Sequence, residues 1–279
     1  MSARMPGLLH LAAAVGRPDD PYDTDALVAA VRLAERGGLD FVTFGDPDAP
    51  AGPGLLAALP RVAAATERTG LVVALPPGPA GVPDAVAELD RAGRGRGGWW
   101  SDGTPRPERD AADAAPPVSR PVHVVRAAGP RDPAVLCADV ILVRAAGLTQ
   151  AAALRTGVRA LAAESGRDPE GLRVLAELIV DLDGEYAAEP GHGGGGPRPT
   201  PRGPLYRGGP VDLADLIASW HAEHVVDGFH LTPADPRRDL ERLVNGTVAL
   251  LQHRALFRTF YPGGTLRDHL GLARSRALT

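Results

Sequence analysis

Short apolar runs alternate with segments of helical periodicity along most of this 279-residue chain. After the run Leu8–Val15, for example, apolar residues recur at helical spacing from Leu27 to Ala34, and glycines then end the helix. Such alternation is typical of a parallel sheet whose strands are joined by crossover helices. Eight strand–helix units predict one α/β domain, a single (β/α)8 TIM barrel over residues 1–279. The expected strands are Leu8–Val15, Leu39–Gly45, Leu71–Leu75, Gly97–Trp100, Pro121–Ala127, Ala138–Arg144, Arg173–Leu182 and Gly228–Leu231.

Two segments rich in proline or glycine, Ser101–Arg120 and Gly184–Pro210, follow the fourth and seventh expected strands. Their compositions cannot bury a core, so we expect long flexible loops at both places. Because both follow strands, they should emerge at the carboxyl end of the barrel, where barrel active sites are built. The alternative to a solvated loop is a lid that orders over a ligand.

Charge and cysteine content exclude several classes of protein. All 30 basic residues are Arg, they are interspersed with acidic residues, and the net charge is −4, so we expect no nucleic-acid partner. Cys137 is the only cysteine, which rules out an internal disulfide and fits a reducing, cytoplasmic compartment. The run Leu8–Val15 is similar to a signal-peptide core, but it contains His10 and the barrel needs it as a strand. No apolar run is long enough to span a membrane.

The C-terminal segment, residues 256–279, carries the most specific motif. Leu256–Leu272 reads LFRTFYPGGTLRDHLGL. This motif closely resembles the C-terminal signature of the bacterial luciferase-like flavin monooxygenases, in the branch of the nitrilotriacetate, long-chain alkane and dibenzothiophene-sulfone monooxygenases. Other segments resemble the same family in chain order, namely Leu33–Asp46, Thr66–Leu71, Glu88–Trp99, Arg120–Val140 and Asp227–Pro233. The resemblance implies the same barrel, shortened, with the tail packed on it.

The resemblance also implies a function. Members of this family bind reduced FMN supplied by a separate flavin reductase, and with O2 they oxygenate a small organic substrate. They are commonly homodimers that pack through barrel helices, and the Ala-rich helix Leu55–Ala65 offers small side chains for such a contact. One alternative is a family member without flavin, either a redox-neutral biosynthetic enzyme or a non-catalytic partner subunit. Another is a deazaflavin cofactor, which is used elsewhere in the superfamily.

The chain departs from the family pattern where the flavin would lie. Trp99 is followed by Trp100 and Ser101, where the family has Asn and a Val-Thr-Ser run. Gly129 is followed by the segment Pro130–Pro133, where the family places serines that hold the flavin phosphate. Because proline has no backbone N–H, an anion cradle of amides and hydroxyls is lost there. A third polar turn is replaced by Pro76–Pro79.

Several residues at strand ends are candidates for cofactor binding. They are Asp46, Trp100, Ser101, Arg126, Gly129 and Arg144. Asp46 would point into the carboxyl-end opening, although a turn or helix-cap acid is the alternative. Trp100 would partly fill the flavin volume or would simply pack in the core. Arg126 and Arg144 could hold a phosphate or carboxylate, or could pair with loop acids.

Two histidines are the candidates for catalysis. His10 and His230 lie in or at the ends of the first and last expected strands. Each could serve as an acid or base, or could be a satisfied buried polar residue. No His, Cys or Asp cluster has the spacing of metal ligands, so we expect no metal site.

Overall fold

The structure, a computed structural model, describes residues 8–15, 23–75, 82–101, 120–183 and 196–272. Its strands are β1 (His10–Val15), β2 (Phe41–Phe44), β3 (Gly70–Ala74), β4 (Gly97–Ser101), β5 (Val122–Arg126), β6 (Val140–Val143), β7 (Arg173–Asp181), β8 (Leu205–Arg207) and β9 (Gly228–Pro233). Strands β1 to β7 and β9 pair in parallel, and the β6–β7 pairing closes them into an eight-stranded barrel. The expected (β/α)8 barrel is confirmed.

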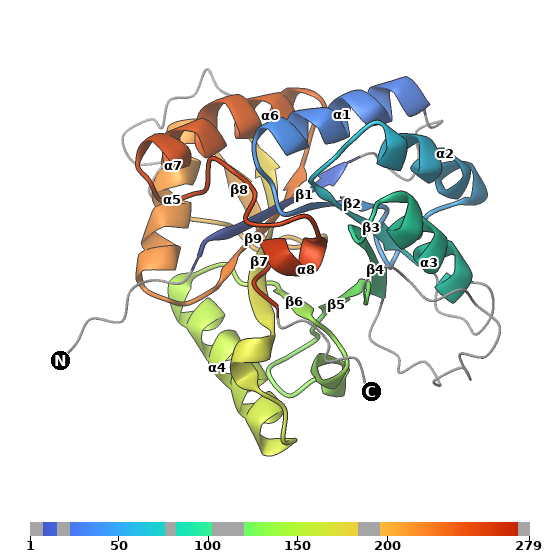
Figure 1. Ribbon diagram of the computed structural model, residues 1–279. Helices are drawn as coiled ribbons and strands as arrows, with labels where there is room; N and C mark the ends of the chain where they lie inside the picture. Colours follow the sequence, from blue (N-terminus) through green and yellow to red (C-terminus); the bar gives the residue numbers. More distant parts are fainter. Residues whose placement is uncertain (1–7, 16–22, 76–81, 102–119, 184–195, 273–279) are drawn as a thin grey trace.

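Helices surround this barrel (Figure 1). They are α1 (Thr24–Arg36), α2 (Pro53–Ala64), α3 (Val82–Ala92), α4 (Leu148–Glu164), α5 (Pro210–Ala222), α6 (Arg238–Arg242), α7 (Ala249–His253) and α8 (Leu266–His269). The first begins at Asp23, whose carboxylate accepts from the amides of Asp25 and Ala26, and it buries Leu27 and Val31 toward the strands. A helix therefore forms wherever a capped apolar stripe can cover the outer face of the barrel.

Alternate residues of each strand face the barrel interior and the helical layer. Ala12, Phe41, Val124 and Leu175 belong to the cluster of buried residues inside the barrel. Their neighbours along the chain, such as Leu11 and Val42, belong to the cluster that packs against the helices. This two-residue period places every second side chain of a strand in the barrel lumen.

The C-terminal tail closes the amino end of the barrel. Leu266 and Leu270 of this segment are fully buried and pack in the interior cluster. Tyr261 donates from its hydroxyl to the carbonyl of Leu39 at 2.9 Å, and Arg258 pairs with the buried Asp40. In Figure 1, α8 lies across the end of the strands. The motif that identified the tail in the sequence is thus a set of structural contacts.

Part of the expected loop 184–210 has regular structure. Leu205–Arg207 forms β8, which pairs with the end of β7, and Tyr206 is 4% exposed. The strand forms because β6 is short and leaves the edge of β7 unpaired beyond Ala176. Residues 184–195 and 102–119, where the rest of the two expected loops lies, are outside the described residues, as are Pro76–Pro79 and 273–279.

The last long helix differs from a regular α-helix. Its apolar period predicts one continuous helix, but a π-helical segment, Leu243–Val248, separates α6 from α7. The helix passes Pro210 closely there, since a Cβ on Gly246 would lie 2.6 Å from the Pro210 Cβ. The wider turn keeps Leu243, Val244 and Val248 buried despite this approach.

Candidate active site

Arg126 is the centre of an ion-pair cluster at the carboxyl end of the barrel. Its Nε and Nη2 donate to the two carboxylate oxygens of Glu177 on β7, at 2.8 and 2.7 Å. Its Nη1 and Nη2 donate to Asp46, which follows β2, at 3.2 and 2.5 Å. Arg144, which follows β6, donates from Nε to Glu177 at 3.1 Å. Three of the residues predicted from the sequence, Asp46, Arg126 and Arg144, therefore meet at one opening, which we call the mouth.

Burial and pairing act against each other on the pKa values of this cluster. Burial raises the pKa of Glu177, but the hydrogen bonds and charge of Arg126 outweigh it and hold that pKa below its ordinary value. The same balance lowers the pKa of Asp46. Burial lowers the pKa of Arg126, and its bonds to Glu177 and Asp46 raise it to a value above that of a free guanidinium. All three groups are charged at neutral pH, and the donors of Arg126 are engaged.

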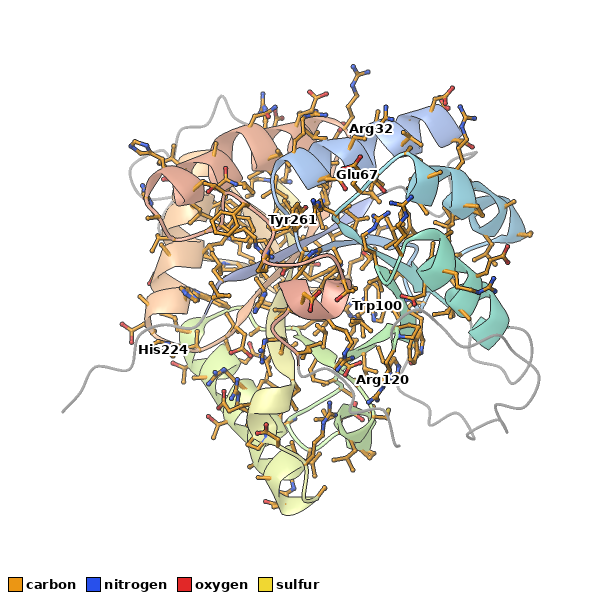
Figure 2. All side chains as sticks on the ribbon, viewed as in Figure 1. Arg32, Glu67, Trp100, Arg120, His224 and Tyr261 are labelled. Atoms are coloured by element: carbon orange, nitrogen blue, oxygen red, sulfur yellow. The ribbon has the colours of Figure 1, made fainter. Side chains whose placement is uncertain are left out.

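Trp100, which is labelled in Figure 2, lies next to this cluster in the barrel lumen. Its side chain comes from β4, is 1% exposed and packs with the interior residues. The guanidinium carbon of Arg126 lies 4.8 Å from the centre of its ring, a cation–π contact. His230 of β9 packs edge-on against the same ring at 5.3 Å and shares a 2.9 Å hydrogen bond with Thr43. Burial lowers the pKa of His230 to about 4, so the ring is neutral at pH 7.

A small cavity opens beside Trp100. It has a volume of ≈ 220 Å³ and is lined by residues that include Asp46, Trp100, Arg202 and Thr232. Within the part of the chain that the structure describes, the indole N–H of Trp100 and Nδ1 of His230 are buried without a hydrogen-bond partner. A buried polar atom without a partner is costly, so both atoms favour a bound molecule at this position.

Three of the predicted residues lie away from the mouth. Ser101 follows Trp100 and therefore points to the outer side of β4, where its hydroxyl shares a 2.9 Å hydrogen bond with His123. His10 begins β1 and so lies at the amino end, where Nδ1 bonds to the Asp40 carboxylate at 3.0 Å. Gly129 follows β5 on a loop that packs on α4.

The loop after Gly129 satisfies its own amides. The carboxylate of Asp132 accepts from the amide of Ala128 at 2.7 Å and from that of Ala134 at 2.9 Å, which caps a short 3₁₀ turn. Pro130 lies so close to α4 that a Cβ on Gly157 would be 2.3 Å from its Cβ. The place where the resemblance puts a flavin phosphate therefore holds a carboxylate of the protein itself.

Glu177 is a mouth residue that the sequence analysis did not select as a candidate for binding or catalysis. It is the acidic residue in the middle of the buried strand β7 and is 5% exposed. A lone carboxylate in an otherwise apolar strand is the signal that could have identified it, since a buried charge requires a partner. Which arginine supplies that partner depends on barrel closure.

Two further properties bear on function. Among the described residues, no group of three or more His, Cys, Asp or Glu side chains could hold a metal ion. Within the same residues, the helices are all too short or too polar to cross a membrane.

Comparison with known proteins identifies relatives over part of the chain. No protein-family model matches it. Over 69 residues, 25% of the chain, it is 45% identical to nitrilotriacetate monooxygenase component A of Aminobacter aminovorans. Over 69 residues it is 39% identical to dibenzothiophene-sulfone monooxygenase of Rhodococcus erythropolis. The chain thus matches about 15% of the length of each of these curated relatives.

The fold is shared over a much longer stretch. It is similar to EDTA monooxygenase from Chelativorans sp. BNC1, with a TM-score of 0.75 and 16% identity over 96% of this chain and 99% of that chain. The barrel, the C-terminal tail packed on its amino end and the matched sequence agree with the family that the tail motif resembles. Over the matched segment the chain is similar in sequence to these monooxygenases, and over nearly its whole length it shares their barrel fold.

Proposed function

We propose that the protein is a luciferase-like oxidoreductase, a flavin-dependent monooxygenase that acts on a small organic substrate at the mouth. Under this proposal reduced FMN comes from a separate flavin reductase, and O2 is the oxidant. The observation that carries it is the buried indole N–H of Trp100, which lies without a partner beside the mouth cavity of a family barrel. The names of the relatives, which are monooxygenases, support the reaction class.

The mouth does not fit a flavin ring in the arrangement described. Its cavity of ≈ 220 Å³ is below the roughly 300–1,000 Å³ of typical ligand pockets. Trp100 fills the adjoining lumen, and Arg126 is held by Glu177 and Asp46. FMN binding would require Trp100 and Arg126 to move, so we expect weak binding. Arg144, whose side chain is 34% exposed, and Arg202, which lines the cavity, are cations that a phosphate could reach.

The filled lumen and small cavity at the mouth also favour a second candidate function, a family barrel without flavin. Such a protein would be a redox-neutral biosynthetic enzyme or a non-catalytic partner subunit. The specific observation is the Asp132 carboxylate, which takes the amides at the expected phosphate position and would repel a phosphate. Both candidates accommodate a homodimer through barrel helices, which light scattering at micromolar concentration would test.

A cofactor titration decides between the two candidates. FMN, reduced FMN under anaerobic conditions and a deazaflavin are titrated into the wild type and into Trp100→Asn, with fluorescence and absorbance as readouts. We expect weak wild-type binding of FMN and about ten-fold tighter binding by Trp100→Asn, because the smaller side chain clears the lumen. Trp220→Phe, at a buried ring of α5, is the matched aromatic control. Absence of binding by both wild type and Trp100→Asn would support the flavin-free candidate.

A further inference from the structure

A second and larger cavity lies at the opposite end of the barrel from the mouth. Its volume is ≈ 600 Å³, within the range of small-molecule sites. It is bounded by the starts of β1 and β7, by α4, by the end of α5 and by the tail at Leu270 and Gly271. His224, at the end of α5, lies at its edge and is labelled at the lower left of Figure 2.

Three arginines contribute more positive charge to this cavity than its carboxylates neutralise. Arg155 and Arg159 of α4 donate to Asp227 at 2.9 and 3.1 Å, and Arg159 also pairs with Glu170. Arg173, at the start of β7, also lines the cavity. Among the described residues that line the cavity, three guanidinium groups therefore accompany two carboxylates, and one of these, Glu170, has a side chain that is 60% exposed.

Arg173 carries the charge that is not matched. Its guanidinium donates to carbonyl oxygens of Leu270 at 2.7 Å, Gly271 at 2.8 Å and Glu170 at 2.9 Å. Within the described part of the chain it forms no ion pair with a carboxylate. Burial lowers its pKa, which reflects a cation that is incompletely compensated by its surroundings. An anion in the cavity would compensate this charge.

The guanidinium N–H donors of the two arginines on α4 are also incompletely used. The Nε atoms of Arg155 and Arg159 are buried without a hydrogen-bond partner among the described residues. Arg155 donates to Asp227 through Nη2, which leaves the other end of its guanidinium available. Because a guanidinium has five donors in a planar fork, it can hold a second anion while it remains bound to Asp227.

His10 completes the wall of the cavity with an oriented ring. Nδ1 bonds to the fully buried carboxylate of Asp40 at 3.0 Å, and that carboxylate also accepts from the amide of Leu11 at 2.8 Å. An ionised carboxylate only accepts, so Nδ1 carries the proton toward Asp40. Nε2 is then the nitrogen that Asp40 does not engage, on a residue that lines the cavity.

We propose that the amino-end cavity is a binding site for a small molecule that carries a carboxylate or phosphate group. Arg155 and Arg173 supply the positive charge, and His10 forms part of the cavity wall. The site is at the other end of the barrel from Arg126 and Trp100, so it does not depend on flavin binding. The rival explanation is that the arginines only tie α4 and β7 together through Asp227.

Calorimetric titration of the whole protein tests this site. Inorganic phosphate and succinate are titrated separately at constant ionic strength, so that the two arms distinguish a phosphate ligand from a carboxylate ligand. We expect saturable binding of at least one anion by the wild type. Arg155→Gln should weaken that binding about ten-fold, because it removes one charge-assisted contact. Arg155→Lys should retain part of it.

The matched control is Arg131→Gln, which removes the same charge from an exposed pair with Glu164 outside the cavity. It should leave anion binding unchanged. Proton NMR of the wild type, with the His10 signal assigned by His10→Gln, should show a shift of that signal on anion addition. The proposal is overturned if neither anion saturates, if Arg131→Gln weakens binding as much as Arg155→Gln, or if the His10 signal does not move. A loss of FMN binding would leave all of these results unaffected.

Discussion

At the mouth, the carboxylates of Glu177 and Asp46 close directly on Arg126, and the cavity beside them has ≈ 220 Å³. At the amino end, Arg173 is held by carbonyl oxygens instead, and the cavity has ≈ 600 Å³. Both ends concentrate arginine, but Arg126 and Arg144 at the mouth share the lumen carboxylate of Glu177, whereas Arg173 at the amino end contacts carbonyl oxygens. The side chains paired at the mouth occupy the barrel lumen. The carbonyl contacts of Arg173 with the tail instead leave the amino-end cavity open to a ligand.

The largest expected effect breaks the cluster at the mouth. Glu177→Ala leaves Arg126 and Arg144 without their shared carboxylate in a buried position. We expect a loss of about 3–5 kcal/mol in the free energy of unfolding, measured by urea denaturation. Glu164→Ala, which removes an exposed partner of Arg131, should cost only about 0–1 kcal/mol. Equal losses in the two variants would show that the mouth pairs are no stronger than surface pairs.

The second effect concerns the C-terminal tail that packs on the amino end of the barrel. Leu266 is fully buried between the strands, and a Cβ on Gly70 would lie 2.6 Å from its Cδ1. Leu266→Ala should therefore leave a cavity and lower the free energy of unfolding by about 3 kcal/mol. Phe260→Ala, at a tail side chain that is 75% exposed, should change it by less than about 0.5 kcal/mol. If thermal melts of the two variants coincide, the tail does not close the barrel as described.

The third effect is a pH dependence that belongs to the mouth. Burial lowers the pKa of His230 to about 4 in the folded protein, below the ordinary value of 6.5. Between these two values the unfolded chain binds more protons, so this histidine makes stability fall as pH decreases from 6.5 toward 4. Its share of the loss between pH 7 and pH 5 should be about 2 kcal/mol.

The variant His230→Gln isolates that share. Glutamine retains a group that can bond to Thr43 but does not titrate. Its free energy of unfolding, measured in urea at pH 7 and pH 5, should decline less than that of the wild type by about the same 2 kcal/mol. Identical declines would mean that His230 is not held neutral beside the mouth cluster.

The barrel itself could be predicted because its signals are local. The alternation of apolar runs with helical stripes located every strand of the closed barrel, including β4, whose Gly97–Ser101 sequence is weakly apolar. The motif from Leu256 to Leu272 predicted a packed tail, and its Tyr261 and Arg258 make the contacts that hold it. Asp46, Arg126 and Arg144 were selected because they lie at strand ends, and the carboxyl ends of parallel barrel strands meet at one opening, where the structure brings them together.

Other features depended on geometry that no local pattern encodes. Ser101 follows Trp100 by one residue, and the two-residue period of a strand sends it to the opposite side of β4. β8 formed only because the edge of β7 was left unpaired by the short β6. His10 was a reasonable candidate by residue type, but its place at the start of β1 puts it at the amino end.

By itself, the sequence determined which segments become strands and helices and that the tail packs on the barrel, because periodicity and short motifs act over a few residues. The tertiary structure alone decided that Arg126 meets Glu177, 51 residues later in the chain, and that Arg173 meets the backbone of the tail. Barrel closure sets these distances, since it brings together side chains from strands far apart in the sequence. The physical difference between a filled mouth and an open amino-end cavity arises at that step.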